Sequence, residues 1–505
     1  MEESKKMKKK ITFPTAFTVL YIVLILAALL TYLIPAGSYA KLSYDVDLNL
    51  FTETFPDGTT KTFEGTQKTL DDLGVRNDVA KFQDGSINKP VAIPGTYEQV
   101  TKNPQGIKEI LIAPILGVYD SIGIILFVFM IGGVIGVINE SGAINAGIAA
   151  LSKATKGHEY LLIIFVTFLI SLGGTTFGLA EETIAFYPIL IPVYLAAGYD
   201  AIVCIAAIYL GSSIGTMFST TNPFSVVIGS NAAGISFTEG IAFRLIGLVV
   251  GLVIVLAYII RYANRIHKDP EKSLLYELRE EMKAHFSSEV KEEPFTTRRI
   301  IILILFILSF VLMIFGVSKL GWWFEEMTAL FIVAGVLIAI VGGIGEKKFI
   351  STFIAGAADF MGVGLVIGIA RSINIILESG LISDTILYGL SNVVSGMSPN
   401  LFIIIMMFVF MILGFFISSS SGLATLAIPI MAPLADSVGV SREVIITAFI
   451  FGQGLMSFIT PTGLILASLE MVHVTYDKWL RFVWPLLLIF AVVAIAILLI
   501  EVNFA

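Results

Sequence analysis

The charged residues of this 505-residue chain are gathered into three segments, and the long stretches between them are almost free of charge. Of the 71 Lys, Arg, Asp and Glu residues, 43 lie in residues 1–10, 36–109 and 261–299. The whole chain is 14% charged and 56% hydrophobic, whereas an ordinary globular protein is about 25% charged. This segregation predicts a membrane protein with several spanning helices. It excludes a soluble enzyme, a nucleic-acid-binding protein and a disordered scaffold.

The sequence shows no pattern typical of catalysis or of a metal site. Cys204 is the single cysteine, so no intramolecular disulfide can form, and its apolar surroundings favour a packing role. The four histidines show neither an HExxH motif nor another ligand spacing. A Walker A motif is absent, which argues against ATP-driven transport. We therefore expect a protein that is not an enzyme and has no cofactor.

The first apolar stretch and the polar segment after it set the expected topology. Residues 13–35 are longer than the core of a signal peptide and are followed by no convincing cleavage site, so we expect a retained transmembrane helix. The basic residues 1–12 would lie in the cytoplasm. Residues 36–106 would form an extracytoplasmic insertion, in which residues 55–59 (FPDGT) predict a β-hairpin turn. The insertion could cap the external entrance, but we favour an insertion without chemistry.

A second polar segment, residues 264–298, divides the rest of the chain into two halves. Basic residues flank it at Arg261 and at Arg298-Arg299, and an excess of basic residues at the membrane edge is typical of cytoplasmic loops. We therefore expect a cytoplasmic linker at 264–298, followed by one linking helix at 299–317.

Residues 107–263 and 326–505 resemble each other, which predicts an internal duplication. Short motifs recur in the same order, at offsets between 238 and 244 residues. The matched pairs are Ile138–Gly142 with Ile376–Gly380, Gly178–Ala180 with Gly422–Ala424, Pro188–Pro192 with Pro429–Pro433, and Pro223 with Pro461. The linking helix 299–317 has no counterpart, so the second copy would cross the membrane in the opposite direction and end outside the cytoplasm. An inverted-topology repeat is typical of secondary transporters.

Two stretches, 158–197 and 399–436, predict re-entrant hairpins. Each is apolar along both arms and polar in the middle, at residues 173–176 (GGTT) and 418–422 (SSSSG). Irregular backbone at membrane depth is stable only where protein or a water-filled cavity satisfies it. The alternative is two ordinary helices in each stretch. We favour hairpins because their tips would supply backbone and hydroxyl ligands.

Broken helices are predicted at 200–231 and 443–470. Each contains a polar run near a proline, Pro223 or Pro461, which removes a backbone N–H and opens the preceding turn. The freed carbonyls can bind a cation, and the new helix N-terminus can bind a carboxylate. The alternative is an ordinary proline kink, but two such runs at matched positions favour a site. If sodium is coupled, we expect it at Gly178, Asn222, Gly422 and Thr460.

Three charged residues are expected deep in the membrane, where charges are costly and usually functional. Glu181 and Glu182 follow the first hairpin tip and could bind a cationic substrate, carry a proton, help to bind sodium or pair with a basic residue. Arg371 lies mid-segment, so we expect it to pair with them or to bind a substrate carboxylate. Arg244 lies nearer a helix start, where we expect it to snorkel to the interface.

Five short runs carry a resemblance to a known family. They are Gly173–Pro192, Gly198–Asp200, Ser219–Phe224, Ser418–Gly422 and Thr460–Gly463. Together they resemble the dicarboxylate anaerobic carrier family, in its YfcC-like branch, over the whole chain. The resemblance implies the fold of the ion transporter superfamily: an all-α polytopic membrane protein with an inverted-topology repeat, two re-entrant hairpins and two broken helices. It also implies a scaffold domain, a transport domain that moves like an elevator, and often a homodimer.

We therefore predict a secondary active transporter in the cytoplasmic membrane of a prokaryote, with a small-molecule substrate and the lipid bilayer as its partners. Family activities include four-carbon dicarboxylate uptake and arginine-for-ornithine exchange, and Glu181-Glu182 favours a basic amino acid. A dicarboxylate carrier is the alternative, and a channel or a membrane-embedded enzyme fits less well. Sodium, protons or a counter-substrate could supply the coupling. The predicted substrate-binding residues are Thr175, Thr176, Glu181, Glu182, Ser219, Thr220, Thr221, Asn222, Arg371, Ser419, Ser420, Ser421, Thr460 and Thr462.

Overall fold

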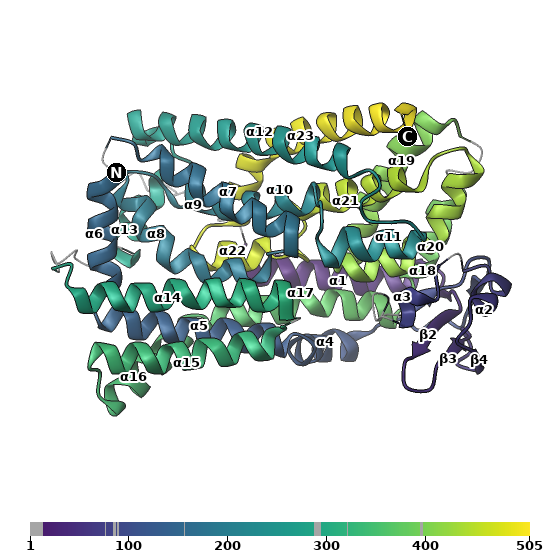
Figure 1. Cartoon of the computed structure of the whole chain (residues 1–505), viewed down its shortest axis with the longest axis horizontal. Coiled ribbons are helices and arrows are strands. Elements are labelled where there is room, and N and C mark those ends of the chain that lie inside the picture. Colours follow the sequence, from purple (N-terminus) through teal and green to yellow (C-terminus); the bar gives the residue numbers. More distant parts are fainter. Residues whose placement is uncertain are drawn as a thin grey trace, which may run out of the picture.

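The computed structural model contains long helices that run along one axis and a small β-rich unit at one end of that axis (Figure 1). It describes residues 14–75, 77–83, 87, 90–155, 157–286, 294–320, 322–393 and 397–504. The predicted cytoplasmic N-terminus, 1–12, and part of the predicted linker 264–298 lie outside the described residues.

Within these described ranges, nine helices are long and apolar enough to cross a membrane. At 1.5 Å per residue, even the shortest, with 18 residues, extends about 27 Å, close to the thickness of a bilayer core. The nine are α1 (Ala16–Leu33), α5 (Ile122–Glu140), α7 (Tyr160–Phe177), α12 (Ile241–Lys268), α14 (Thr297–Phe315), α15 (Phe324–Gly342), α17 (Met361–Ser379), α19 (Pro399–Phe416) and α23 (Tyr476–Phe504). The chain is therefore a multi-pass membrane protein.

The predicted insertion contains a small mixed unit with its own apolar core. Strands β2 (Lys41–Asp45), β3 (Leu50–Thr54), β4 (Thr60–Glu64) and β5 (Val91–Ala92) form an antiparallel sheet in the order β4-β3-β2-β5. The hairpin expected around residues 55–59 is confirmed, because β3 pairs with β4 across this turn. Buried side chains such as Leu42, Phe51 and Phe82 form the core. The other elements are β1 (Gly37–Ser38), β6 (Glu98–Gln99), α2 (Gln67–Asp72) and α3 (Ala80–Gln83).

The insertion is joined to the helical part by side-chain contacts. The ring of Tyr97 stacks on Tyr388 with centroids 4.1 Å apart, and the backbone N–H of Tyr39 donates to Asp384. The Asn77 amide donates to the backbone oxygen of Asn231 in the first broken helix.

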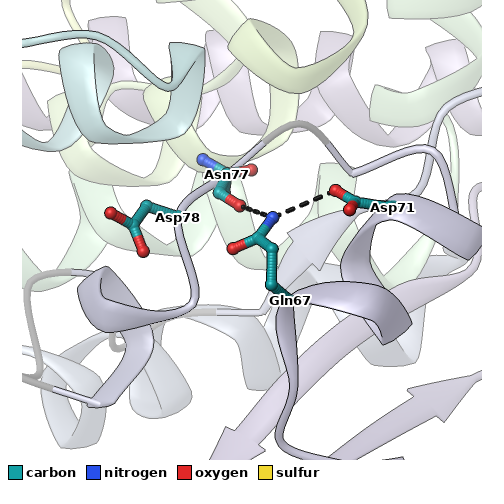
Figure 2. A pocket seen from close by; sticks show the side chains of 4 residues that line it. All are labelled: Gln67, Asp71, Asn77 and Asp78. Atoms are coloured by element: carbon teal, nitrogen blue, oxygen red, sulfur yellow. Dashed lines mark hydrogen bonds between the residues drawn. The ribbon is translucent and has the colours of Figure 1, made fainter.

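A surface pocket of the insertion lies beside this last contact (Figure 2). It is lined by Gln67, Asp71, Asn77 and Asp78. The Gln67 amide donates to Asp71 and to the Asn77 carbonyl, so two acceptors are already engaged. The residues that line the pocket all belong to the insertion, and these hydrogen bonds stabilise its local fold.

The two halves of the helical part exchange short helices. α4 (Ile107–Asp120) packs on α17 of the other half, and α16 (Glu346–Ala358) packs on α5. Glycines permit both contacts: a Cβ at Gly117 would overlap the backbone oxygen of Gly368, and one at Gly356 would overlap that of Gly132. Small residues at such crossings are typical of helices packed in a membrane.

The predicted hairpins and broken helices lie in the middle of the bundle. α7, η1 (Glu181–Phe186) and α8 (Tyr187–Ala196) lie toward the left of Figure 1, whereas α19 and α20 (Ser420–Ser437) lie toward the right, near the insertion.

The first broken helix consists of α9 (Ala201–Ile205), η2 (Ala206–Leu210), α10 (Gly211–Met217), η3 (Pro223–Val227) and α11 (Ile228–Ala233). The second consists of α21 (Arg442–Ser457) and α22 (Ile465–Met471). They cross where Gly454 contacts Met217.

The remaining elements connect these parts. α6 (Ala143–Thr155) follows α5, and α18 (Ser383–Val393) follows α17. η6 (Gly316–Leu320) continues α14, which covers most of the predicted linking helix 299–317. Within the linker, the structure describes η4 (Pro270–Lys272), η5 (Tyr276–Leu278) and α13 (Arg279–Phe286).

Candidate functional site

The first hairpin turns later in the sequence than expected. Gly173-Gly174-Thr175-Thr176 was expected to form the tip, but these residues are the last turns of α7, and this detail is wrong. The turn begins at Gly178, whose φ of +80° suits glycine. Gly174 serves close packing instead, since a Cβ there would lie 2.7 Å from the backbone oxygen of Ser212 on α10.

The first broken helix opens before its proline, as predicted. α10 ends at Met217, residues 218–222 are non-helical, and Pro223 begins η3. Asn222 caps this new start, because its Oδ1 accepts from the Phe224 N–H at 2.8 Å. The freed backbone is therefore satisfied partly by side chains of the break itself.

Hydrogen bonds join the end of α7 to the first break. The buried Thr175 hydroxyl donates to the Phe218 backbone oxygen at 3.2 Å and accepts from the Thr220 N–H at 3.0 Å. The Thr221 N–H donates to the Thr175 oxygen at 3.1 Å, and its hydroxyl donates to the Thr176 oxygen at 3.2 Å. The structure thus brings four predicted residues together, with the side chains of Thr176 and Thr221 exposed.

Two of the predicted sodium ligands also lie side by side in this half. A Cβ at Gly178 would lie 2.8 Å from Asn222 Oδ1, and the Asn222 amide donates to the Gly174 oxygen at 3.3 Å. Ser219 is buried nearby and shares a hydrogen bond of 3.0 Å with Ser225. Backbone and side-chain oxygens therefore gather at this point, and the sodium site itself stays a prediction.

The second tip and the second break form a more loosely joined pair. α19 ends at Phe416, and Ser419 caps α20 by accepting from the Gly422 N–H at 3.2 Å. Ser420 and Ser421 occupy the first two positions of α20. In the break, Thr460 and Thr462 share a hydrogen bond of 2.6 Å.

Among the described residues, a side-chain hydrogen bond links this break to the end of α19. The Thr462 hydroxyl donates to the Phe415 oxygen at 3.4 Å. A Cβ at Gly422 would lie 3.3 Å from the Ser419 side chain of its own tip, and the roles of Gly422 and Thr460 as sodium ligands stay a prediction.

Glu181 and Glu182 begin η1, directly after the first tip. Both are half-buried, and Glu182 accepts from the Ala180 N–H at 3.1 Å. Across the described segments, neither carboxylate takes part in an ion pair. Two carboxyl groups therefore lie together beside the tip, and no basic side chain in the described segments forms an ion pair with either of them.

The expectations for the two arginines are changed by the structure. Arg371 does not pair with Glu181 or Glu182: its Nε donates to Asp120 at the end of α4. Its role toward a substrate carboxylate stays a prediction. Arg244 was expected to snorkel, which is wrong, because its side chain is completely buried in the first turn of α12.

Asn374 is a site residue that the sequence reasoning missed. It lies on α17, is 2% exposed, and donates through Nδ2 to the Ser418 hydroxyl of the second tip at 2.6 Å. Its Oδ1 has no hydrogen-bond partner among the described residues. An amide three residues after Arg371, on the same spanning helix, is the signal that could have identified it.

A family model described as the C4-dicarboxylate anaerobic carrier matches residues 13–503. The chain belongs to this family. The membership agrees with the resemblance based on the short runs, and it covers both halves and all the predicted site residues. The family comprises transporters rather than enzymes, so the protein is a membrane transporter.

Two relatives extend this carrier-family membership along the whole chain. An uncharacterized protein of Haemophilus influenzae is 47% identical over 506 residues, covering 100% of this chain and 99% of its own. A protein of Escherichia coli, under the name "Putative basic amino acid antiporter YfcC", is 30% identical over 501 residues and covers 94% of each chain.

Two solved transporters align with most of the chain at low similarity. The YdaH transporter of Alcanivorax borkumensis has a TM-score of 0.40 and 15% identity, covering 97% of this chain and 99% of its own. MtrF of Neisseria gonorrhoeae has a TM-score of 0.39 and 15% identity, covering 97% and 96%.

Proposed function

We propose that the protein is a secondary active transporter that moves a basic amino acid across the cytoplasmic membrane of a prokaryote. Exchange of the arginine-for-ornithine type and ion-coupled uptake are both compatible with this proposal. The proposal includes an inverted-repeat fold, an elevator motion of the hairpins and broken helices, and a homodimer. The name of the YfcC relative supports the substrate class.

The observation that carries the substrate class is the pair Glu181-Glu182. Two adjacent, half-buried carboxylates without a basic partner among the described residues favour a ligand with positive charge. Arg371 would otherwise be the natural counter-charge, but it is occupied by Asp120. A cationic side chain or ammonium group of the substrate would supply the missing positive charge.

The opposite end of an amino acid needs donors for its carboxylate. The start of α20 offers backbone N–H groups and the hydroxyls of Ser419 and Ser420, with Ser418 positioned by Asn374. Helix N-termini bind carboxylates through such N–H groups and through the helix dipole. We therefore assign the substrate cation to the first tip and the substrate carboxylate to the second tip.

A four-carbon dicarboxylate is the second candidate, and the description of the matching family supports it. Two substrate carboxylates would need positive partners. Arg371 would then have to leave Asp120 and turn to the substrate, while Glu181 and Glu182 would have to be protonated. The basic amino acid requires neither change.

A binding screen separates the two candidates. Arginine, ornithine and lysine should raise the thermal unfolding temperature of the purified protein, whereas succinate and fumarate should not, because a ligand stabilises the state that it binds. Glu181→Gln and Glu182→Gln should remove the shift with arginine. Glu346→Gln, at an exposed position at the start of α16, is the matched control and should keep it. Stabilisation by succinate alone would reject the proposal in favour of a dicarboxylate carrier.

A further inference from the structure

Two charged side chains are completely buried away from the hairpins and breaks. Arg244 lies in the first turn of α12 and Glu501 in the last turn of α23, and both are 0% exposed. α23 ends on the side of the bundle that carries the insertion (Figure 1). A third charge, Glu443, lies in the first turn of α21 and is half-buried. Buried charges are strongly destabilising unless they are paired or neutralised.

The three charges meet around Gly240, the residue before α12. A Cβ at Gly240 would lie 2.8 Å from Glu501 Oε1, 3.2 Å from Arg244 Nη1 and 3.3 Å from Glu443 Cβ. Despite this proximity, Glu501 Oε2 and both Nε and Nη1 of Arg244 have no hydrogen-bond partner in the described part of the chain. The cluster therefore has spare hydrogen-bonding capacity at buried atoms, which a structural ion pair would have used.

The hydrogen bonds of Thr447 indicate that the carboxyl group of Glu501 carries a proton. Its hydroxyl oxygen lies 3.0 Å from Glu501 Oε1 and 3.1 Å from the Glu443 backbone oxygen. Both are acceptors when Glu501 is ionised, but a threonine hydroxyl has one proton to donate. With a proton on Glu501, the carboxyl group donates to Thr447, which then donates to the Glu443 backbone oxygen. Protonated Glu501 satisfies this chain of contacts, and ionised Glu501 does not.

We propose that Glu501 is the proton-binding residue of the transport cycle and that it couples substrate movement to proton movement. This inference rests on the proposed function, since coupling requires transport. One proton from water converts the Glu501 carboxylate into a carboxylic acid, and the same proton leaves when Arg244 approaches the carboxylate. α21 connects the cluster to the substrate region, because Glu443 and Thr447 lie in its first turns and the second break follows its end. A shift of the break therefore changes the partners of Glu501.

The charges that face Glu501 do not balance, and one extra proton would neutralise the excess. α12 contributes Arg244 and α21 contributes Glu443, while α19, which also packs on α23, has no charged side chain. Arg442 is engaged in its own ion pair, and Glu239 is exposed and accepts from a backbone N–H of its own loop. Two buried or half-buried carboxylates thus face one guanidinium, and a single proton neutralises the excess charge.

An infrared titration of the purified protein without substrate tests the proton site directly. The difference spectrum between the wild type and Glu501→Gln should contain the band of a protonated carboxyl group, which disappears as the pH rises. Glu443→Gln should move the midpoint of this titration to lower pH by roughly one unit, because a neighbouring negative charge is removed. Glu239→Gln is the matched control and should leave the midpoint unchanged. A difference spectrum without this band, or an unchanged midpoint in Glu443→Gln, would overturn the proposal.

A transport assay then tests the coupling. Proteoliposomes that contain a pH-sensitive dye should report proton movement when arginine is added to the wild type and to Glu239→Gln, and none with Glu501→Gln. Proton movement with Glu501→Gln equal to that of the wild type would contradict the coupling. If the wild type moves no arginine at all, the proposed substrate is wrong, while the infrared titration still decides whether Glu501 binds a proton.

Discussion

The two hairpin tips differ in how firmly each is joined to its own broken helix. In the first half, Thr175 exchanges backbone and side-chain hydrogen bonds with residues 218–221, and Asn222 adds a further bond. In the second half, the hydrogen bond described between tip and break runs from Thr462 to the Phe415 oxygen and is 3.4 Å long. The second tip is held instead from α17, through Asn374.

This difference indicates that the two tips differ in how easily they separate from their broken helices, although their sequence motifs match. Because several hydrogen bonds join the end of α7 to the first break, we expect the first tip to move together with its broken helix. In the second half fewer of the described hydrogen bonds join tip and break, so we expect this tip to separate at lower free energy, because fewer buried groups lose partners. We therefore expect the second tip to open for substrate entry while the first tip stays closed.

The largest expected effect comes from the glycine contact that fixes the first tip. A Cβ at Gly174 on α7 would lie 2.7 Å from the Ser212 backbone oxygen on α10, so Gly174→Ala should destabilise the protein by about 1–3 kcal/mol through overpacking. Gly414→Ala is the matched change in the second half, where the new Cβ would meet Gln453 Cγ at 3.4 Å. It should be neutral or slightly stabilising, because alanine favours helix. Thermal unfolding measures both, and equal losses would contradict the comparison.

The hydrogen bonds of the two tips give the second prediction. Thr175→Val removes a buried donor, so the Phe218 oxygen loses this partner and the Thr220 N–H keeps the weaker bond of 3.3 Å to the Thr175 backbone oxygen, a loss of about 1–3 kcal/mol. Thr462→Val removes the long bond to the Phe415 oxygen and the bond that Thr462 shares with Thr460 inside the break, and it should cost about 0.5–1.5 kcal/mol. Thr176→Val, at an exposed position, is the control. Thermal unfolding of the three variants should rank them in this order, and a larger loss for Thr462→Val would reverse the comparison.

The third prediction concerns the amide that supports the second tip. Asn374→Ala removes the hydrogen bond to Ser418, so residues 417–422 should exchange their backbone amide protons faster, because local opening becomes easier. Residues 174–180 of the first tip should keep their exchange rates. Hydrogen–deuterium exchange with mass spectrometry measures both segments in one experiment. Equal acceleration in both tips would show that the two tips open together.

The class of the protein and the two breaks could be predicted from the sequence because each depends on local properties. Long uncharged stretches have few places to lie except a bilayer, and Pro223 cannot continue a helix without losing a hydrogen bond. Both effects act over one segment, so composition and spacing are sufficient to predict them.

Contacts between distant segments could not be predicted in this way. Gly173-Gly174 has the composition of a turn, but it is helical because α10 packs closely against it. Arg371 pairs with Asp120, which lies 251 residues earlier on a short helix exchanged between the halves. Neither the packing of short helices on the opposite half nor the buried position of Arg244 produces a periodic pattern in the sequence.

The smallest expected effect concerns the loop between α22 and α23 in the second half, which contacts the described part of the predicted linker 264–298. His473 Nε2 lies 3.2 Å from His285 Nε2 of α13, a geometry in which one neutral ring donates and the other accepts. Burial, followed by the proximity of His285, lowers the pKa of His473 from its usual 6.5. The folded state therefore binds fewer protons than the unfolded state. The contribution of this contact to stability is complete above pH 6.5 and declines as the pH falls below it.

Substitution of His473 tests this pH dependence. His473→Asn removes the titrating ring and suits the backbone, whose φ is +52°, because asparagine tolerates the left-handed region. In the wild type, amide exchange in α13, corrected for the intrinsic effect of pH, should accelerate between about pH 7.5 and about pH 5.5, the range in which histidine titrates. In His473→Asn it should be equally fast at both pH values, whereas His158→Asn, in the first half, should behave like the wild type. Acid-dependent exchange that persists in His473→Asn would assign the effect to another titrating group. This pH dependence would then no longer distinguish the second half from the first.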